Sequence, residues 1–574
     1  MKEAPVRRLA QIVEGAGARL YDHRHPGPLA RAIIAGLGPL VLRSTPNDKW
    51  NLHVFIPEWL GALRNPVQEP LPRPKRIFLF CAYRIEFTLN LNLATLLAWR
   101  GHRVTIGYLP KLQSPIKEPR RDHWSARPYL LAALKDVERL SGGQIRCVEL
   151  GEATAAATPV DEAFIARQVR ADLMMVTRRE ALDVNDPEVR ENLAYYEDLG
   201  HRAQRAAWAH FLAHRDDYDL CLIPNGTTFE GAHFCRVAKA VGLPVNTFEK
   251  FAFKKVRAID HGDHCMAFDD LDLLWNLRQA AGYETEPFYS RACTRAMALL
   301  EEHRAGVTRN WAFRLQTAAP QSAEGVRAAL GLRNVEPFVL VCPNVPFDAG
   351  YMELTTVFPT MRAWLVETVS FLLRETPSTV VVRAHPAEAL HWGTRERSAD
   401  ILEEARLPSE RLVVVPGDAG VNTYGLIDAC RFGVVFSSTV GLEMAMLGRS
   451  VLVGSHIYYT RRGFSVDVED RARYFAELAR LARGPVGLSP EQTRQARLFY
   501  YLLHFVWQRP YPYDKPSCIR RFPPAKLLAD GRIVRYVETL DALTMDPQEW
   551  RDYAKQWLCA EHDRHLEGRD DDEC

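Results

Sequence analysis

Two residues suited to phosphate chemistry follow directly on an apolar run that is typical of a buried strand. The run that starts at Thr379 leads into Arg383, Ala384, His385 and Pro386. The proline fixes the backbone dihedral φ and helps to hold the loop. Arg and His both donate hydrogen bonds to phosphate oxygens, and Arg does so with two nitrogens at once. We therefore predict that Arg383 and His385 are catalytic residues that hold phosphate, with Pro386 beside them.

A hydroxyl-rich turn ends another apolar run. Ser437, Ser438 and Thr439 stand between a predicted strand and a predicted helix, and Glu443 follows about one helical turn later. Hydroxyls and free backbone N–H groups at the start of a helix bind anions. Simple helix capping is the alternative, with Glu443 completing a capping box. Together with Arg383 and His385, the turn favours a phosphate site, and Glu443 could face ribose hydroxyls.

Further polar residues follow other predicted strands. In the second half of the chain, Asn422, Thr423 and Tyr424 are candidates for binding the nucleotide, or else a helix N-cap and a packing residue. Asn344 and Asp348 follow the strand at 338–342 and are further donor-site candidates. In the first half, the turn of Asn225, Gly226 and Thr227 is the predicted acceptor side. A carboxylate near the cleft could deprotonate an acceptor hydroxyl, so Glu249 is the predicted general base, with Glu230 as the alternative.

Metal and cofactor motifs are not expected. Asp217-Tyr-Asp219 and Asp270-Leu-Asp272 have the spacing of some metal-dependent transferases, but three-residue acidic patterns arise readily by chance. His261, Asp263 and His264 are better explained as a polar loop than as metal ligands. The chain has no P-loop, HExxH or GxSxG motif. We expect no metal and no required cofactor.

Composition narrows the class of protein further. The 574 residues are 47% hydrophobic and 25% charged, with a formal net charge of +2, so a globular protein is expected and nucleic acid is not an expected partner. The 11 cysteines form no CxxC pair, which favours a reducing cytoplasm. No apolar run reaches the ~18–20 residues that span a bilayer. A soluble or at most peripheral protein is expected.

Alternating strands and helices predict an α/β protein made of two successive doubly wound domains around a cleft. We expect a long helical stretch over about 161–214, mostly helical structure over 270–335, and a helical tail over 490–560 that packs across both domains. The expected strands lie at 77–81, 104–109, 218–223, 244–249, 338–342, 379–383, 412–415, 433–436 and 451–454.

These patterns divide the chain into four predicted regions. Residues 1–74 form a basic appendage that ends in a Pro-rich joint, and its charge could touch anionic lipid or simply form a solvated helical face. Residues 75–335 form the acceptor domain with a helical connection. Residues 336–489 form the nucleotide-sugar domain. Residues 490–574 form the helical segment and an acidic tail.

Several blocks of sequence resemble a known family. Leu-Ala-Trp-Arg-Gly-His-Arg-Val at 97–104 resembles the passage that opens many GT-B glycosyltransferases. Four blocks resemble bacterial capsule or surface polysaccharide biosynthesis proteins of the Kdo-transferase-like GT-B type, and the residues at 454–459 and 463–464 continue the likeness. The blocks are Val-Cys-Pro-Asn-Val-Pro-Phe-Asp at 341–348, Val-Arg-Ala-His-Pro-Ala-Glu at 382–388, Asn-Thr-Tyr-Gly-Leu-Ile-Asp at 422–428 and Ser-Ser-Thr-Val-Gly-Leu-Glu-Met-Ala-Met-Leu-Gly at 437–448.

The resemblance covers about residues 75–480 and implies two Rossmann-like domains, with the nucleotide sugar on the C-terminal one and the acceptor on the N-terminal one. In such relatives the His-Pro and Ser/Thr motifs hold the nucleotide phosphate, often of CMP. It implies a metal-independent glycosyltransferase that moves a sugar, with a CMP-linked Kdo-like donor as the best candidate, to a surface or capsular polysaccharide or its lipid-linked acceptor. Peripheral contact with the inner membrane or the polysaccharide assembly machinery would accompany this role.

Two alternatives stay open: a CDP-polyol phosphotransferase of teichoic-acid type and a catalytically silent GT-B binding module. A nucleotide-sugar epimerase is disfavoured, because no constellation of acid and base carboxylates is evident.

Overall fold

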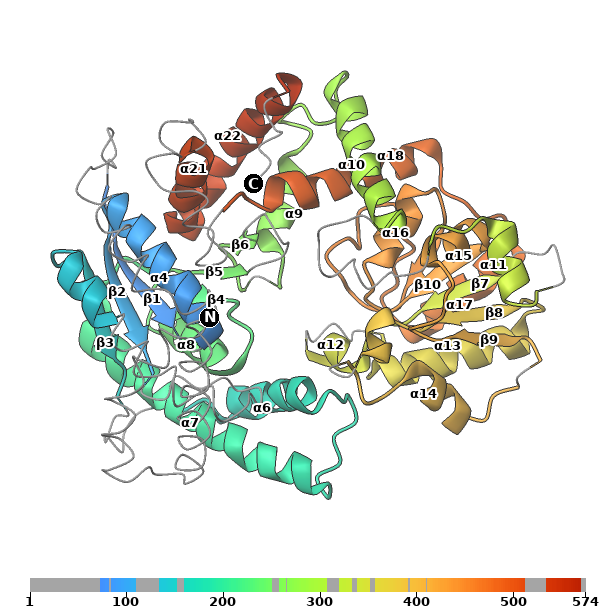
Figure 1. The fold of residues 1–574 in the computed structure, drawn as a ribbon, viewed down its shortest axis with the longest axis horizontal. Coiled ribbons are helices and arrows are strands. Elements are labelled where there is room, and N and C mark those ends of the chain that lie inside the picture. Colours follow the sequence, from blue (N-terminus) through green and yellow to red (C-terminus); the bar gives the residue numbers. More distant parts are fainter. Residues whose placement is uncertain are drawn as a thin grey trace, which may run out of the picture.

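The protein contains two α/β domains that lie side by side and are joined by helices (Figure 1). The structure is a computed structural model. It describes residues 73–81, 84–109, 134–151, 159–249, 258–264, 266–306, 319–332, 338–351, 357–390, 393–408, 410–511 and 533–568. The predicted appendage at 1–74 and the acidic end after 568 therefore lie almost wholly outside the described residues.

The first domain is built on a six-stranded sheet of order β3-β2-β1-β4-β5-β6. All neighbouring pairs are parallel except β5 and β6, which are antiparallel. Four strands match the predicted ones, whereas β3 and β6 were not predicted, because their apolar runs are too short to stand out. The strands are β1 (Arg76–Cys81), β2 (Arg103–Tyr108), β3 (Ile145–Glu149), β4 (Leu220–Pro224), β5 (Val245–Glu249) and β6 (Ala258–Asp260).

The long helical stretch expected over 161–214 consists of two helices. Asp161 caps the start of the first helix, and Arg178 ends it in the left-handed conformation, with φ 57°. Asp186 then caps a new helix whose first residue is Pro187, a residue that starts helices but does not continue them. The helices of this domain are α4 (Arg84–Trp99), α6 (Glu162–Thr177), α7 (Pro187–His214) and α8 (Phe229–Ala240).

The second domain is built on a five-stranded parallel sheet of order β11-β10-β7-β8-β9. Every strand predicted after residue 336 is present. The strands are β7 (Val339–Cys342), β8 (Val380–Arg383), β9 (Leu412–Val415), β10 (Phe432–Val435) and β11 (Val451–Val453). The helices are α12 (Pro346–Tyr351), α13 (Met361–Glu375), α14 (Ser398–Glu404), α15 (Thr423–Ala429), α16 (Val440–Met446) and α17 (Arg471–Arg483).

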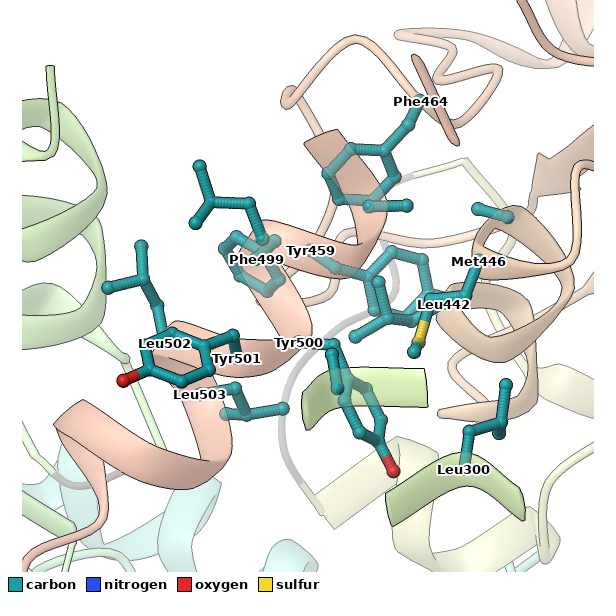
Figure 2. Close-up of a cluster of buried hydrophobic side chains, with 14 of the residues drawn as sticks. Leu300, Leu442, Met446, Tyr459, Phe464, Phe499, Tyr500, Tyr501, Leu502 and Leu503 are labelled. Carbon is teal, nitrogen blue, oxygen red and sulfur yellow. The ribbon is translucent and has the colours of Figure 1, made fainter. Parts of the chain in front are cut away.

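Helices from the connection and the tail join the two domains. The tail begins with α18 (Pro490–Tyr501) and one turn of π-helix, η5 (Leu502–Trp507), which pack with the connecting helices in the core of the second domain. Figure 2 shows part of this core, in which Tyr459 and Phe464 lie beside Phe499 and Tyr500. Farther along, Tyr536 and Leu540 pack against the core of the first domain, as expected of a tail that contacts both. The remaining helices are α9 (Asp269–Leu277), α10 (Phe288–Arg304), α11 (Ala323–Ala329), α21 (Ile533–Thr544) and α22 (Pro547–Leu566).

Candidate functional site

A cavity of about 900 Å³ lies at the carboxyl edge of the second sheet. Its walls come from the loops after β7, β8, β10 and β11, from the segment 264–272 ahead of and within α9, and from the tail at Tyr500 to Gln508. Because all five strands are parallel, their carboxyl ends meet at one edge of the sheet, where open α/β sheets bind their ligands. Eleven of the predicted site residues line this cavity: Asn344, Asp348, Arg383, His385, Pro386, Thr423, Tyr424, Ser437, Ser438, Thr439 and Glu443.

The strand order explains why the cavity forms there. From β7 the chain moves to β8 and β9 on one side, and then crosses to β10 and β11 on the other. The loops after β7 and β10 therefore lead away from each other and leave a crevice between neighbouring strands. Asn344 from the first loop donates a hydrogen bond from Nδ2 to Ser437 Oγ of the second loop, over 3.0 Å. The crevice is thus lined by polar side chains that are already oriented.

Arg383 lies at the end of β8 and is only 4% exposed. Its Nε donates to Thr423 Oγ1 over 3.3 Å, and its Nη1 and Nη2 donate to the carbonyl oxygens of Pro416 and Gly417. Burial lowers the pKa of this guanidinium below its usual value. A guanidinium has five N–H groups, so these contacts fix its orientation and leave N–H groups for an oxygen of a ligand.

His385 presents a defined ring nitrogen to the cavity. Its Nδ1 accepts a hydrogen bond from the backbone N–H of Ala387 over 3.1 Å, and Pro386 starts the short helical turn that this bond closes. Burial, with a smaller contribution from the positive charge of Arg383, lowers the pKa of His385 to about 4. The ring is therefore neutral at pH 7, and its proton must lie on Nε2. His385 can donate one hydrogen bond to an anion without carrying a charge itself.

The Ser437–Thr439 turn is held by a buried tyrosine. The Tyr459 hydroxyl donates to the backbone oxygen of Ser438 over 2.8 Å, and Ser438 Oγ accepts from the N–H of Val440 over 3.4 Å. Thr439 makes no side-chain capping bond at the start of α16. The capping box that was the alternative explanation for Glu443 is therefore not formed.

Glu443 instead points to a group of tyrosines. The Tyr424 hydroxyl donates to Glu443 Oε2 over 3.2 Å, and both side chains are buried in the cavity wall. Asn422 does not line the cavity; its Oδ1 caps α15 by accepting from the N–H groups of Tyr424 and Gly425. The N-cap alternative thus describes Asn422, whereas Tyr424 and Thr423 reach the cavity.

Asp348 is a carboxylate in the wall of the cavity. It lies on α12, which packs against α6 of the first domain, so it stands where the two domains meet. Within the described ranges its side chain has neither a hydrogen-bond nor an ion-pair partner, and burial raises its pKa to about 6. A carboxylate with such a pKa can take up a proton near neutral pH.

The predicted acceptor-side residues of the first domain bind one another. Asn225 donates from Nδ2 to Glu249 Oε2 over 2.7 Å, and its Oδ1 accepts from the N–H of Thr227 over 3.0 Å. None of these side chains, nor Gly226, lines the cavity. Gly226, with φ 82°, lies beside His264, which does line it: a Cβ on the glycine would be 3.4 Å from the His264 Cβ. The turn therefore borders the cavity wall.

Several lining residues were not predicted from the sequence. Asp272 forms an ion pair with Arg462, which joins the connection to the loop after β11. In the sequence, Asp272 belongs to the Asp270-Leu-Asp272 pattern, which was attributed to chance. From the tail, His504 reaches the cavity from the π-helical turn, a rare geometry that is frequent at functional sites, and Gln508 reaches it from directly after that turn. His264, His456 and Arg461 also line the cavity.

The described ranges contain no group of three or more His, Cys, Asp or Glu side chains arranged to hold a metal ion. His261, one of the residues considered for that role, is buried and hydrogen-bonded to Asp270 and to the backbone oxygen of Ala542. None of the helices in the part of the chain that the structure describes combines the length and the apolar character needed to cross a bilayer.

The fold and the cavity define the class of this protein. Both sheets contain the strand order of a doubly wound nucleotide-binding domain, 3-2-1-4-5 when each set is counted along its own chain, and the polar cavity lies where elements of both domains meet. Two Rossmann-like domains in this arrangement constitute a GT-B-like fold, which confirms the predicted fold class.

No protein-family model matches the chain, and no curated protein matches its sequence. Among solved structures, it is similar to KpsC, a beta Kdo 2,4 transferase of Thermosulfurimonas dismutans, with 16% identity over 49% of this chain and 88% of that one and a TM-score of 0.33. It is also similar to a UDP-GlcNAc 2-epimerase from Neisseria meningitidis, with 11% identity, 74% and 95% coverage and a TM-score of 0.24. A sucrose-phosphate synthase from Thermosynechococcus elongatus matches with 12% identity, 81% and 99% coverage and a TM-score of 0.24. The class stated above rests on the strand order and the cavity, not on these similarities.

Proposed function

We propose that this protein is a glycosyltransferase that binds a nucleotide-sugar donor in the cavity of the second domain. One observation carries the proposal: Arg383, His385 and the turn from Ser437 to Thr439 line the same cavity, at the switch point of a doubly wound sheet. Guanidinium, imidazole N–H and hydroxyl groups are donors that suit phosphate oxygens. We assign the phosphate of the donor to this group.

The same donors can stabilise the departing nucleotide without a metal ion. When the glycosidic bond to the phosphate breaks, negative charge grows on the phosphate oxygens. Fixed donors in a site from which water is excluded stabilise such charge most effectively, because they need no reorganisation during the reaction. Arg383 and His385 are fixed donors in this sense, because each is held by a hydrogen bond to the backbone. We therefore propose metal-independent transfer, with Tyr424 and Glu443 orienting the nucleoside and Glu443 accepting from ribose hydroxyls.

Asp348 is the carboxylate that we propose for proton transfer. It lines the cavity at the face nearest the first domain and has a pKa of about 6, whereas Glu249 is hydrogen-bonded to Asn225 outside the lining. A general base must lie within hydrogen-bond reach of the hydroxyl that it deprotonates. Asp348 is better placed for an acceptor hydroxyl that enters between the domains.

The sequence resemblance supports a CMP-linked, Kdo-like sugar as donor and a surface or capsular polysaccharide, or its lipid-linked precursor, as acceptor. A lipid-linked acceptor would bring the protein to the inner face of the cytoplasmic membrane. A CDP-polyol phosphotransferase would use the same phosphate contacts, and a silent binding module would use them without turnover. These alternatives make different predictions for binding and catalysis.

A thermal-shift series with CMP, CDP, UDP, GDP and ADP, each with and without Mg²⁺, tests the proposal. A ligand present at about 100 times its Kd stabilises the folded state by about 2.7 kcal/mol. We expect CMP to stabilise the protein equally well with and without Mg²⁺. A preference for CDP would favour the phosphotransferase, and a preference for UDP or GDP would indicate another sugar donor. Stabilisation by none of the five would contradict a nucleotide-dependent transferase.

The His385→Ala variant provides the matched control. It removes the Nε2–H donor, so the stabilisation by CMP and the turnover should both be lost while the protein without ligand still unfolds cooperatively. Unchanged turnover in this variant would exclude His385 from the site. Binding of CMP without turnover of any CMP-sugar would favour the silent module.

A further inference from the structure

We infer that His303 and Tyr500, which lie outside both sheets, position the carboxylate of Glu443 and thereby give the site its preference for ribose over deoxyribose. The inference rests on the proposed nucleotide site and names residues that the sequence did not suggest. His303 comes from the connecting helix α10, and Tyr500 from the tail helix α18. We assign both a positioning role: His303 does not line the cavity, and the hydroxyl of Tyr500, whose side chain does line it, is engaged by His303 Nδ1.

The three side chains form one buried polar cluster. His303 Nδ1 lies 3.1 Å from the Tyr500 hydroxyl oxygen and 3.8 Å from Glu443 Oε1. His303, Tyr500 and Glu443 are each 2% exposed. On its other side, Glu443 Oε2 accepts from the Tyr424 hydroxyl. The carboxylate is therefore flanked by side chains from three helices that are far apart in the sequence.

Packing fixes where the Tyr500 hydroxyl lies. Figure 2 shows Tyr500 among the apolar side chains of the second-domain core, near Leu442 of α16 and Leu300 of α10. Leu300 is one helical turn before His303, so the same contact that holds the tyrosine ring also holds α10 against the tail. A densely packed core allows few rotamers, and the hydroxyl is therefore held at a defined place beside His303 Nδ1.

We assign the proton to His303 Nδ1, since the contact with the Tyr500 oxygen permits donation in either direction and Glu443 Oε1 lies near the same nitrogen. With that proton, the ring nitrogen donates to the Tyr500 oxygen and places its positive end toward Glu443 Oε1. Without it, a nitrogen lone pair would face a negatively charged oxygen. The cluster therefore attracts Oε1 while leaving its hydrogen-bonding capacity for a ligand.

Glu443 Oε1 is an acceptor in the cavity wall that has no donor among the described residues, and its surface is almost wholly covered. Although Glu443 is buried in the cavity wall, its Oε1 accepts no hydrogen bond from any side chain or backbone group within the described ranges. Leaving a buried charged acceptor unsatisfied is costly, and a hydroxyl donor on the ligand would relieve that cost. The two hydroxyls of a ribose supply such donors, and a deoxyribose lacks one of them. Discrimination should then depend on how firmly Oε1 is held.

The test compares ribo- and deoxyribonucleotides in the full-length protein. The dissociation constants of CMP, dCMP and 3′-deoxy-CMP are measured by calorimetry for the wild type, Tyr500→Phe and Tyr501→Phe. Tyr501 is the control, because it is an equally buried neighbour on α18 that does not line the cavity. In the wild type and in Tyr501→Phe, CMP should bind about tenfold more tightly than at least one deoxy analogue. In Tyr500→Phe the ratio should fall toward one, while the Kd of that analogue stays within about twofold, a pattern that general loosening of the fold would not produce.

The outcomes separate this inference from the proposed function. If the wild type binds CMP with clear discrimination and Tyr500→Phe retains it, the positioning role is wrong and the nucleotide site stands. If the wild type binds CMP without discrimination, the ribose contact and its positioning are both wrong. If no nucleotide binds, the proposed function fails with them. Should Tyr500→Phe not fold, His303→Phe removes the same Nδ1 contact and must show the same loss of discrimination.

Discussion

The side-chain amide of Asn344 donates a hydrogen bond to the hydroxyl of Ser437 over 3.0 Å and thereby joins the loops that follow β7 and β10. These strands are neighbours in the sheet, but their loops lead in opposite directions, so the bond spans the mouth of the crevice. Both residues are buried and both line the cavity. The bond fixes the Ser437 hydroxyl at the place proposed for the phosphate.

Replacing the amide by a carboxylate should expel phosphate. The Asn344→Asp variant changes little in shape but puts a negative charge beside Ser437, where a nucleotide phosphate would be repelled. We expect the affinity for CMP to fall at least tenfold. Cytidine, which has no phosphate, should bind equally to both proteins in the same calorimetric assay. An equal loss for cytidine and CMP would place the phosphate elsewhere.

The pH dependence of the reaction should report Asp348. Burial raises the pKa of its carboxyl to about 6, and a general base must be deprotonated to act. We expect kcat/KM to fall as the pH is lowered through about 6. Asp348→Asn should lower kcat by about 10²- to 10⁴-fold and remove this limb of the profile. Glu249→Gln is the matched control, and a larger loss in that variant would restore Glu249 as the base.

Gly441→Ala should disturb the Ser437–Thr439 turn, because the added methyl group would clash with Tyr459. A Cβ built on Gly441 would lie 2.2 Å from the hydroxyl oxygen of Tyr459, which donates to the Ser438 backbone. The tyrosine must then move, which costs about 1–3 kcal/mol in a packed core and releases the turn. We expect a lower melting temperature together with weaker CMP binding. Tyr459→Phe removes the hydroxyl and leaves contacts of 3.0 Å to Val435 and 3.1 Å to the ring, so it should restore much of the stability of Gly441→Ala; failure to do so would contradict this cause.

A second contact between the domains lies at the loop between α6 and α7. The buried carboxylate of Glu180 accepts from the N–H groups of Met361 and Arg362 at the start of α13, over 2.8 and 3.1 Å. In return, Glu396 of the second domain accepts from the N–H of Glu180 over 2.6 Å. In each direction, a carboxylate of one domain thus accepts hydrogen bonds from backbone N–H groups of the other. These bonds connect the two domains at a place distant from the tail.

The stability that Glu180 contributes should fall as the pH rises. Burial raises its pKa from 4.5 to about 7, so the folded protein binds more protons than the unfolded chain between these values. Stability then decreases with rising pH over that range, by on the order of 2 kcal/mol. Relative to Glu180→Gln, the wild type should lose stability between pH 5 and pH 8 in chemical denaturation. A difference between the two proteins that does not change with pH would contradict the assignment.

Local patterns were sufficient to predict much of the second domain. Its five strands are continuous apolar runs, and Arg383, His385 and Ser437 follow directly on strand ends, where the next polar residues must lie at the edge of the sheet. The first domain was predicted less well. The strands β3 and β6 are short and partly polar, and the break after α6 depends on one arginine in the left-handed conformation, for which the sequence carries no strong signal.

The sequence by itself determined the strands, the polar turns after them and hence the edge at which a ligand would bind, because these features depend on residues that are neighbours in the chain. Only the tertiary structure decided which turns share a cavity. It placed Asn422 in a helix cap, kept Glu249 out of the lining and brought His303, Asp272, Tyr500 and His504 to the site. These outcomes depend on how the connection and the tail pack against the second domain. The contact between His303 and Tyr500, for example, joins residues 197 positions apart, and no local pattern of side chains encodes such contacts.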